Sequence, residues 1–182
     1  MKYLVMCEGA NERELIRILL EHKCLFFDEN DLLGLTPYHA RQIKNSTIVK
    51  AELNMYTGNV EVIRVGDKQS DELLIPKEYQ EKITSVKKYC TKPELEILLI
   101  ISEGMLKEFE KVKSNTKAKD FAKKYIQYKH KKYDNSSLFY REYYDDRVEL
   151  LIKSIISYSR YNGSHDKDEY YLKELLKDTY LL

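Results

Sequence analysis

A short apolar run that ends in Glu-Gly and leads into a helical pattern constrains this chain most. Residues 3–7 (YLVMC) are apolar and stop at Glu8-Gly9, as a buried strand followed by a turn does. Asn11 can cap a helix, and apolar residues then recur at helical spacing over 15–19. A strand, a tight turn and an amphipathic helix in direct succession are typical of α/β folds with a parallel sheet.

The remaining sequence predicts an α/β core followed by a helical half. Residues 59–65 (NVEVIRV) alternate like a strand and stop at Gly66-Asp67. Further expected elements are a strand at 25–27 and helices at 38–45, 95–112, 148–158 and 169–182. We therefore expect a core over residues 1–90, with a small parallel sheet and flanking helices. An α-helical extension over residues 91–182 packs on that core.

Charge and cysteine content narrow the class of protein. The chain has 182 residues, with Lys+Arg 31 and Asp+Glu 30, so any surface that attracts nucleic acid must be local. The three cysteines, Cys7, Cys24 and Cys90, show no paired spacing, which predicts reduced thiols in a cytoplasmic protein. No apolar run is long enough for a membrane span, and the N-terminus does not resemble a signal peptide. We expect no association with a membrane.

Acidic residues follow both predicted strands of the core. Glu8 follows residues 3–7, Asp67 follows residues 59–65, and Asp71 lies four residues further on. Parallel neighbouring strands would bring these carboxylates to one edge, where they repel unless a cation lies between them or one is protonated. Oxygen ligands suit Mg²⁺ or Mn²⁺, which can activate water for phosphodiester hydrolysis.

The segment Cys7-Glu8-Gly9-Ala10-Asn11-Glu12 resembles the CEG-x-x-E first motif of Toprim domains in the OLD-type and RloB-like nucleases. A stretch of RloB-like chains is also similar to residues 93–98 (PELEIL), and the resemblance covers roughly residues 1–100. It implies that Glu8 is the Toprim glutamate and that Asp67 and Asp71 form the second acidic motif. Toprim enzymes usually carry Asp-x-Asp there, whereas this chain has DKQSD over 67–71.

The resemblance implies a Mg²⁺-dependent nuclease in a phage-defence or restriction system, acting on DNA or RNA. The alternative is a non-catalytic Toprim-like interaction module that works with an ATPase partner. The sequence contains no Walker A motif, so that partner would supply the ATPase.

Basic residues with interleaved tyrosines over 117–132 predict a second functional surface. Contacts with nucleic acid would come from Lys68, Lys123, Lys124, Lys131 and Lys132, with Tyr125, Tyr128 and Tyr133 stacking on bases. The alternative is a solvated helix face whose tyrosines pack inward.

Each acidic residue also has an ordinary structural explanation. Glu8 could be a turn carboxylate, and Glu12 could be an acid of the first helical turn. Asp67 and Asp71 could belong to a turn and the start of a helix. Glu94 would complete a capping box at the start of the next helix.

Overall fold

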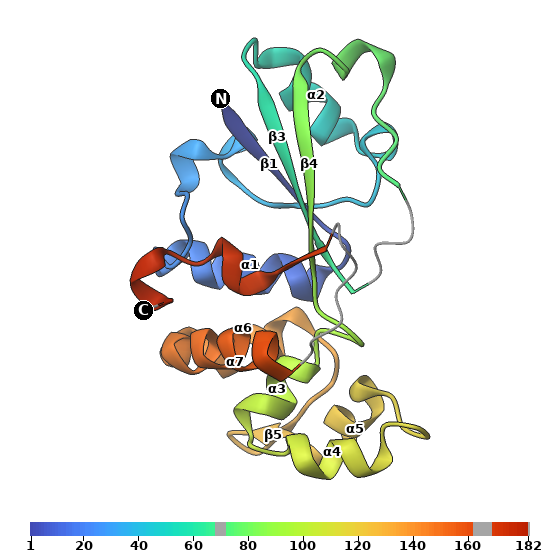
Figure 1. The fold of residues 1–182 in the computed structure, drawn as a ribbon, viewed down its shortest axis with the longest axis vertical. Helices are drawn as coiled ribbons and strands as arrows, with labels where there is room; N and C mark the ends of the chain where they lie inside the picture. Colours follow the sequence, from blue (N-terminus) through green and yellow to red (C-terminus); the bar gives the residue numbers. More distant parts are fainter. Residues whose placement is uncertain (68–71, 162–168, 182) are drawn as a thin grey trace.

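A five-stranded, entirely parallel sheet organises the first half of the molecule (Figure 1). A computed structural model describes residues 1–67, 72–161 and 169–181. The strand order is β2-β1-β3-β4-β7. The strands are β1 (Lys2–Cys7), β2 (Tyr38–His39), β3 (Val60–Gly66), β4 (Ile83–Cys90) and β7 (Glu169–Tyr171).

Helices flank the sheet and form most of the second half. The α-helices are α1 (Ala10–Glu21), α2 (Thr47–Met55), α3 (Ile97–Ser102), α4 (Leu106–Val112), α5 (Ala118–Tyr125), α6 (Ser137–Tyr144) and α7 (Val148–Tyr161). An antiparallel hairpin joins β5 (Gln127–Tyr128) to β6 (Lys131–Lys132). Single 3₁₀ turns cover Glu29–Asp31, Leu33–Leu35, Ile43–Asn45, Lys77–Tyr79, Asp145–Arg147, Leu172–Leu175 and Asp178–Tyr180.

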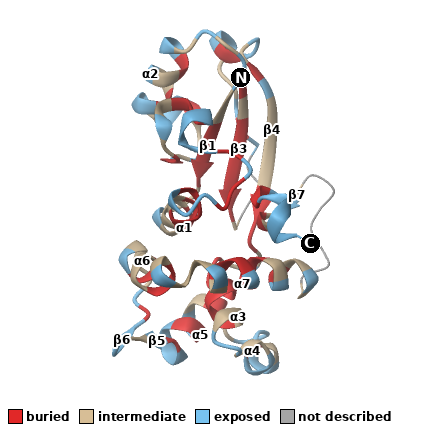
Figure 2. Ribbon diagram, turned by 90° about the vertical axis from the view of Figure 1, so that its left-hand side faces the viewer, coloured by how far each residue is buried: buried red, intermediate tan, exposed pale blue. Residues whose placement is uncertain are grey.

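The two faces of the sheet belong to different hydrophobic clusters because successive side chains of a strand point to opposite faces. Leu4 and Met6 of β1 pack in the cluster that includes α2. Val5 and Cys7 pack in the larger cluster, which includes α1 and the helices of the second half. Figure 2 shows buried residues at the lower ends of β1 and β3 and on the helices below them.

Helix α1 connects the sheet to the helical half. It lies between the sheet and the α6–α7 pair (Figures 1 and 2) and buries apolar residues over most of its circumference, Leu15, Ile16, Ile18, Leu19 and Leu20. The guanidinium of Arg141 on α6 forms ion pairs with Glu14 and Glu21 of α1. The larger cluster therefore runs without interruption from β1 to α7.

The predicted class, an α/β fold with a parallel sheet and a helical C-terminal region, is confirmed. The sequence analysis did not predict strand β4, and it expected a helix where strand β7 lies. The missed strand β4 has an alternation masked by Lys87 and Lys88, and Lys87 pairs with Glu61 of β3 at 2.8 Å. The edge strand β7 comes from the half that we expected to be helical, and it pairs in parallel with β4.

Three predicted elements differ from the structure. Residues 25–27 form no strand, and the edge position belongs to β2, which begins the segment expected to be a helix over 38–45. The helix expected over 95–112 is two helices, because Gly104 adopts a left-handed conformation (φ 68°) between α3 and α4. The last element, expected over 169–182, consists of β7 and two 3₁₀ turns.

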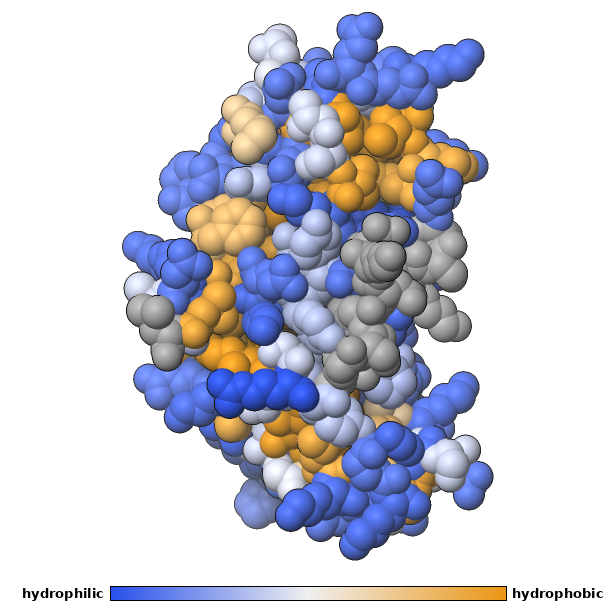
Figure 3. All heavy atoms as spheres, viewed as in Figure 1, coloured by the Kyte–Doolittle hydropathy of each residue, from blue (hydrophilic) through white to orange (hydrophobic). Residues whose placement is uncertain are grey.

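The face shown in Figure 3 is largely hydrophilic, and its apolar atoms gather at the upper right, along the left side and at the lower centre. On α2 itself, Ile48 and Met55 are exposed. Within the described residues, every helix is too short or too polar to cross a membrane.

We expect a fragment of residues 1–90 not to fold on its own. Truncation after Cys90 removes β7 and the helices that cover the outer face of α1, so Leu19 and its neighbours would become exposed. Circular dichroism during urea titration should show one cooperative transition for the whole chain and none for the fragment. A cooperative transition in the fragment would contradict the shared core.

Candidate functional site

Glu8 and Asp67 lie at the same edge of the sheet because β1 and β3 are parallel neighbours. Their register pairs Cys7 with Val65, and the Glu8 N–H donates to the Val65 carbonyl at 2.9 Å. The residues that follow both strands line one open cavity of about 300 Å³. Its lining consists of Glu8, Gly9, Ala10, Asn11, Glu12, Arg41, Asp67, Glu94, Leu95, Glu96, Lys119 and Asn135.

Two glycines leave room for two of the carboxylates. A β carbon added to Gly66 would lie 2.5 Å from Oε2 of Glu8, and one added to Gly9 would lie 2.5 Å from Oε2 of Glu12. Any larger residue at either position would push a carboxylate out of its place. The backbone of Gly9 is extended (φ −132°), so close approach rather than an unusual conformation requires glycine there.

Glu12 is the most strongly perturbed carboxyl group of this cavity. It is only 9% exposed, and burial raises its pKa from 4.5 to about 7. A backbone hydrogen bond opposes this rise in pKa, and the nearby charges of Asp67, Glu8 and Glu96 contribute to it. The fold therefore gathers several carboxylates that oppose one another's ionisation, as binding sites for cations do.

A buried polar network from the second half closes the cavity. Tyr133 donates its hydroxyl to Oε1 of Glu96 at 2.6 Å. With its amide oriented to satisfy both neighbours, Asn135 donates to the same oxygen at 3.2 Å and accepts from Nζ of Lys119 at 3.0 Å. Burial raises the pKa of Glu96, and the hydrogen bond from Tyr133 opposes this rise. These contacts fix Lys119 beside the acidic residues.

Arg41 provides a cationic partner for Glu8. Its guanidinium lies 3.0 Å from Oε1 of Glu8, and the Arg41 side chain is 64% exposed. An exposed arginine loses little by changing partners, so Arg41 can pair with an anionic ligand instead.

The donor chemistry of the cavity fits a hard divalent ion. Its acidic lining offers only carboxylate oxygens, which Mg²⁺ and Mn²⁺ prefer. Across the described ranges, no three His, Cys, Asp or Glu side chains are grouped as a complete metal site. An ion held by Glu8 and Asp67 would take its other ligands from water and substrate phosphate, as Mg²⁺ commonly does.

A second cavity of about 550 Å³ adjoins the first and shares Asp67 and Glu94 with it. It brings three cationic side chains, Lys92, Lys113 and Lys117, next to the acidic edge. Glu94 does not complete a capping box with Thr91, because α3 begins only at Ile97. Its Oε2 instead accepts the backbone N–H of Lys119, in the first turn of α5, at 2.9 Å.

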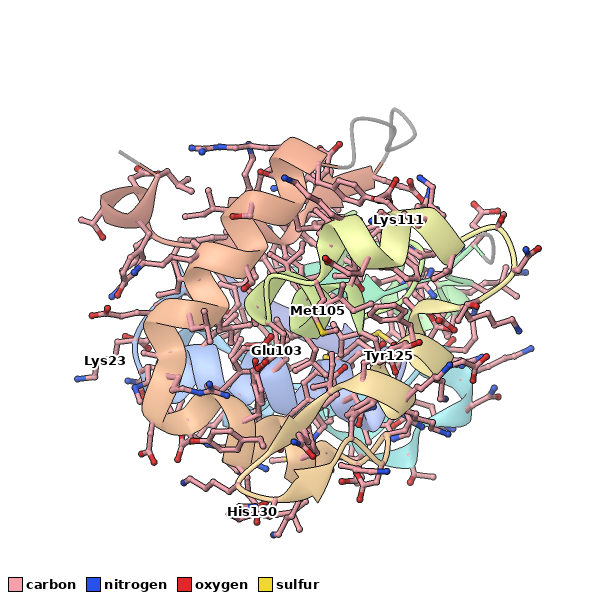
Figure 4. All side chains as sticks on the ribbon, turned by 90° about the horizontal axis from the view of Figure 1, so that it is seen from below. Lys23, Glu103, Met105, Lys111, Tyr125 and His130 are labelled. Atoms are coloured by element: carbon pink, nitrogen blue, oxygen red, sulfur yellow. The ribbon has the colours of Figure 1, made fainter. Side chains whose placement is uncertain are left out.

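The lysines that the sequence analysis assigned to nucleic-acid binding do not line these cavities where the structure describes them. Lys68 and Asp71 lie outside the described residues. Lys123, Lys124, Lys131 and Lys132 are exposed but line neither cavity, and Lys131 pairs with Glu142 at 2.7 Å. Figure 4 shows the hairpin tip with His130 well apart from Lys111 on α4.

The structure adds three functional candidates that the sequence did not indicate, Arg41, Lys92 and Lys113. Within the predicted basic segment 117–132, it places Lys117 and Lys119 at the two cavities. No local motif marks these five residues together, because only the packing of the helical half against the strand ends brings them to one place. Tyr133, expected to stack on bases, is buried and holds Glu96 in place.

Cys7 is buried in the larger cluster, as its position in the strand predicted. Burial raises the pKa of its thiol, so it stays protonated and is a poor nucleophile.

Comparison of the chain with protein-family models, curated proteins and solved structures gives no match.

The buried charge of Glu12 predicts a pH-dependent effect of Glu12→Gln. Because the pKa in the folded state lies above its ordinary value, the stability that neutral Glu12 provides is complete below about pH 4.5 and is lost as pH rises through 7. The variant should match the original protein at pH 4 and exceed its free energy of unfolding by up to about 3 kcal/mol at pH 8.5. Urea titrations in the presence of a chelator measure both free energies of unfolding. An equal difference between variant and original protein at pH 4 and pH 8.5 would contradict the prediction.

Gly66→Ala should destabilise the protein because its new β carbon collides with Glu8. We expect a loss of about 1–3 kcal/mol in the free energy of unfolding, as for other overpacked positions. The double variant Gly66→Ala/Glu8→Ala should recover part of this loss, since it removes the colliding carboxylate. Additive losses in urea denaturation would show that the two side chains do not meet.

Proposed function

We propose that the protein is a Mg²⁺- or Mn²⁺-dependent nuclease of Toprim type that hydrolyses phosphodiester bonds of DNA or RNA, in a phage-defence or restriction setting. One observation carries the proposal. The chain brings Glu8, Glu12 and Asp67 to one cavity at the carboxyl edge of a parallel sheet, beside a lysine-lined cavity. This edge is where open parallel sheets bind ligands.

The residues divide into two roles in this proposal. Glu8 and Asp67 would hold the ion, with Asp71 as a further ligand from outside the described residues. Such an ion lowers the pKa of an attacking water and stabilises the charge of the transition state. Arg41 and Lys119 border the same cavity and would bind phosphate oxygens, which orients the phosphodiester. Lys68 would contact the scissile phosphate, and Lys123, Lys124, Lys131 and Lys132 would extend the contact to more distant phosphates.

The ion pair between Arg41 and Glu8 supports a second candidate function. An arginine that replaces the metal as counter-ion would leave a non-catalytic module on the same scaffold, acting with an ATPase partner. In that case divalent ions would not stabilise the protein, and purification of the module from its source should recover the ATPase.

The nuclease proposal predicts metal-dependent cleavage that requires both strand-end acids. Glu8→Gln and Asp67→Asn should each reduce cleavage of labelled oligonucleotides by about 100-fold or more, because the ion supplies several kcal/mol of transition-state stabilisation. Millimolar Mg²⁺ or Mn²⁺ should raise the melting temperature of the original protein but not of the two variants.

Glu81→Gln is the matched control, since Glu81 is exposed and precedes β4 at the opposite end of the sheet. It should leave both cleavage and the metal-induced rise in melting temperature unchanged. Cleavage that survives Glu8→Gln or EDTA would refute the nuclease.

A further inference from the structure

The 550 Å³ cavity beside the carboxylates has a size and lining that the metal site does not explain. Its volume falls within the range of about 300–1,000 Å³ that is usual for sites of small molecules. It is lined by Asp67, Lys92, Pro93, Glu94, Phe109, Lys113, Thr116, Lys117, Ala118 and Tyr161. Lysines and apolar groups thus face the same space, next to the acidic edge.

Two aromatic side chains, Phe109 and Tyr161, line the apolar part of the cavity. Phe109 of α4 is buried, and its ring packs edge-on against Phe121 of α5 with ring centroids 5.3 Å apart. Tyr161, the last residue of α7, is half-buried and lines the same space with Pro93 and Ala118. Aromatic and apolar surfaces of this kind stack on the faces of nucleobases, with little preference for sequence.

The lysines of the cavity suit the negatively charged sugar-phosphate backbone of a nucleic acid that carries such a base. Lys113 and Lys117 are exposed; Lys113 pairs with Glu110 at 2.7 Å, and Lys117 has no ion-pair partner among the described residues. Because Asp67 and Glu94 line both cavities, the phosphate of a nucleotide bound in the larger one lies toward the smaller one. The two cavities together match one nucleotide and the adjoining phosphodiester.

We propose that this cavity binds an unpaired nucleobase, so that the substrate is a single-stranded nucleic acid. Bases in a duplex are paired and stacked inside the helix and cannot enter a pocket without being extruded. A single strand can present one base to Tyr161 while its phosphate contacts Lys117. This inference rests on the proposed nuclease function and names its substrate class.

Binding without cleavage tests the inference. Fluorescence anisotropy in EDTA compares labelled single-stranded DNA, single-stranded RNA and duplex DNA of the same sequence and length. We expect at least one of the single strands to bind about 10-fold more tightly than the duplex. The single strand that binds more tightly shows whether the protein prefers deoxyribose or ribose. Duplex binding as tight as that of both single strands would overturn the inference.

Variants of the cavity sharpen this experiment. Tyr161→Ala should weaken binding of the preferred single strand roughly 5- to 150-fold, as the loss of one stacked base does, whereas Tyr161→Phe keeps the ring and should bind normally. Lys117→Gln should reduce the slope of log affinity against log salt by about 0.7, which corresponds to one phosphate contact. An unchanged affinity in Tyr161→Ala would refute the base pocket.

Two matched controls separate this cavity from other exposed rings and lysines. Tyr125→Ala and Lys107→Gln change exposed groups that line neither cavity, so both should keep the original affinity for the single strand. Equal losses in these variants would place binding elsewhere and overturn the inference. The melting temperatures of all variants should match that of the original protein, which shows that they are folded. Photocrosslinking of an iodouracil-labelled strand to the original protein should mark Tyr161 or Phe109, and this result does not depend on the folding of any variant.

The outcomes also separate the two proposals. Selective single-strand binding that depends on Tyr161, without any metal-dependent cleavage, would support the base pocket and refute the nuclease. Metal-dependent cleavage that needs Glu8 but is insensitive to Tyr161→Ala would support the nuclease and refute the base pocket.

Discussion

The parallel register of β1 and β3 is the constraint on which the rest of the site depends. It pairs Cys7 with Val65, so the chain leaves both strands at the same level with Glu8 and Asp67 side by side in the topology. A shift by one residue would move Cys7 from the larger cluster to the other face of the sheet. The burial of the alternating apolar residues in β1 and β3 therefore also fixes the position of the acids.

Gathering these acids opposes folding, and local features of the chain make it tolerable. Gly9 and Gly66 leave space for the carboxylates, Arg41 pairs with Glu8, and Glu12 can remain protonated near neutral pH. Such a local cost, in a fold whose core is otherwise mainly apolar, is expected at a functional site. Binding of a cation would relieve the same repulsion.

The second half completes the site as well as the core. Its helices cover the outer face of α1, and the ion pairs of Arg141 join α6 to the same helix. The segment around Tyr133 and the start of α5 then hold Glu96 and Lys119 against the acidic cavity. Stability and the proposed chemistry thus depend on the same half of the chain: α6 and α7 cover α1, whereas most of the lysines lie around α4 and α5, and Tyr161 ends α7.

The sequence by itself determined the strand–turn–helix start, the α/β class and the carboxylates that follow the two strands, because strand and helix periods and turn residues are local properties. It misplaced the edge strand, missed β4 and β7, and pointed to four lysines that line neither cavity, Lys123, Lys124, Lys131 and Lys132. Arg41, Lys117, Lys119 and Tyr161 meet the acids only through packing between segments far apart in the chain. Such long-range contacts leave no local periodicity, so only the tertiary structure decided which cations and rings surround the acidic edge.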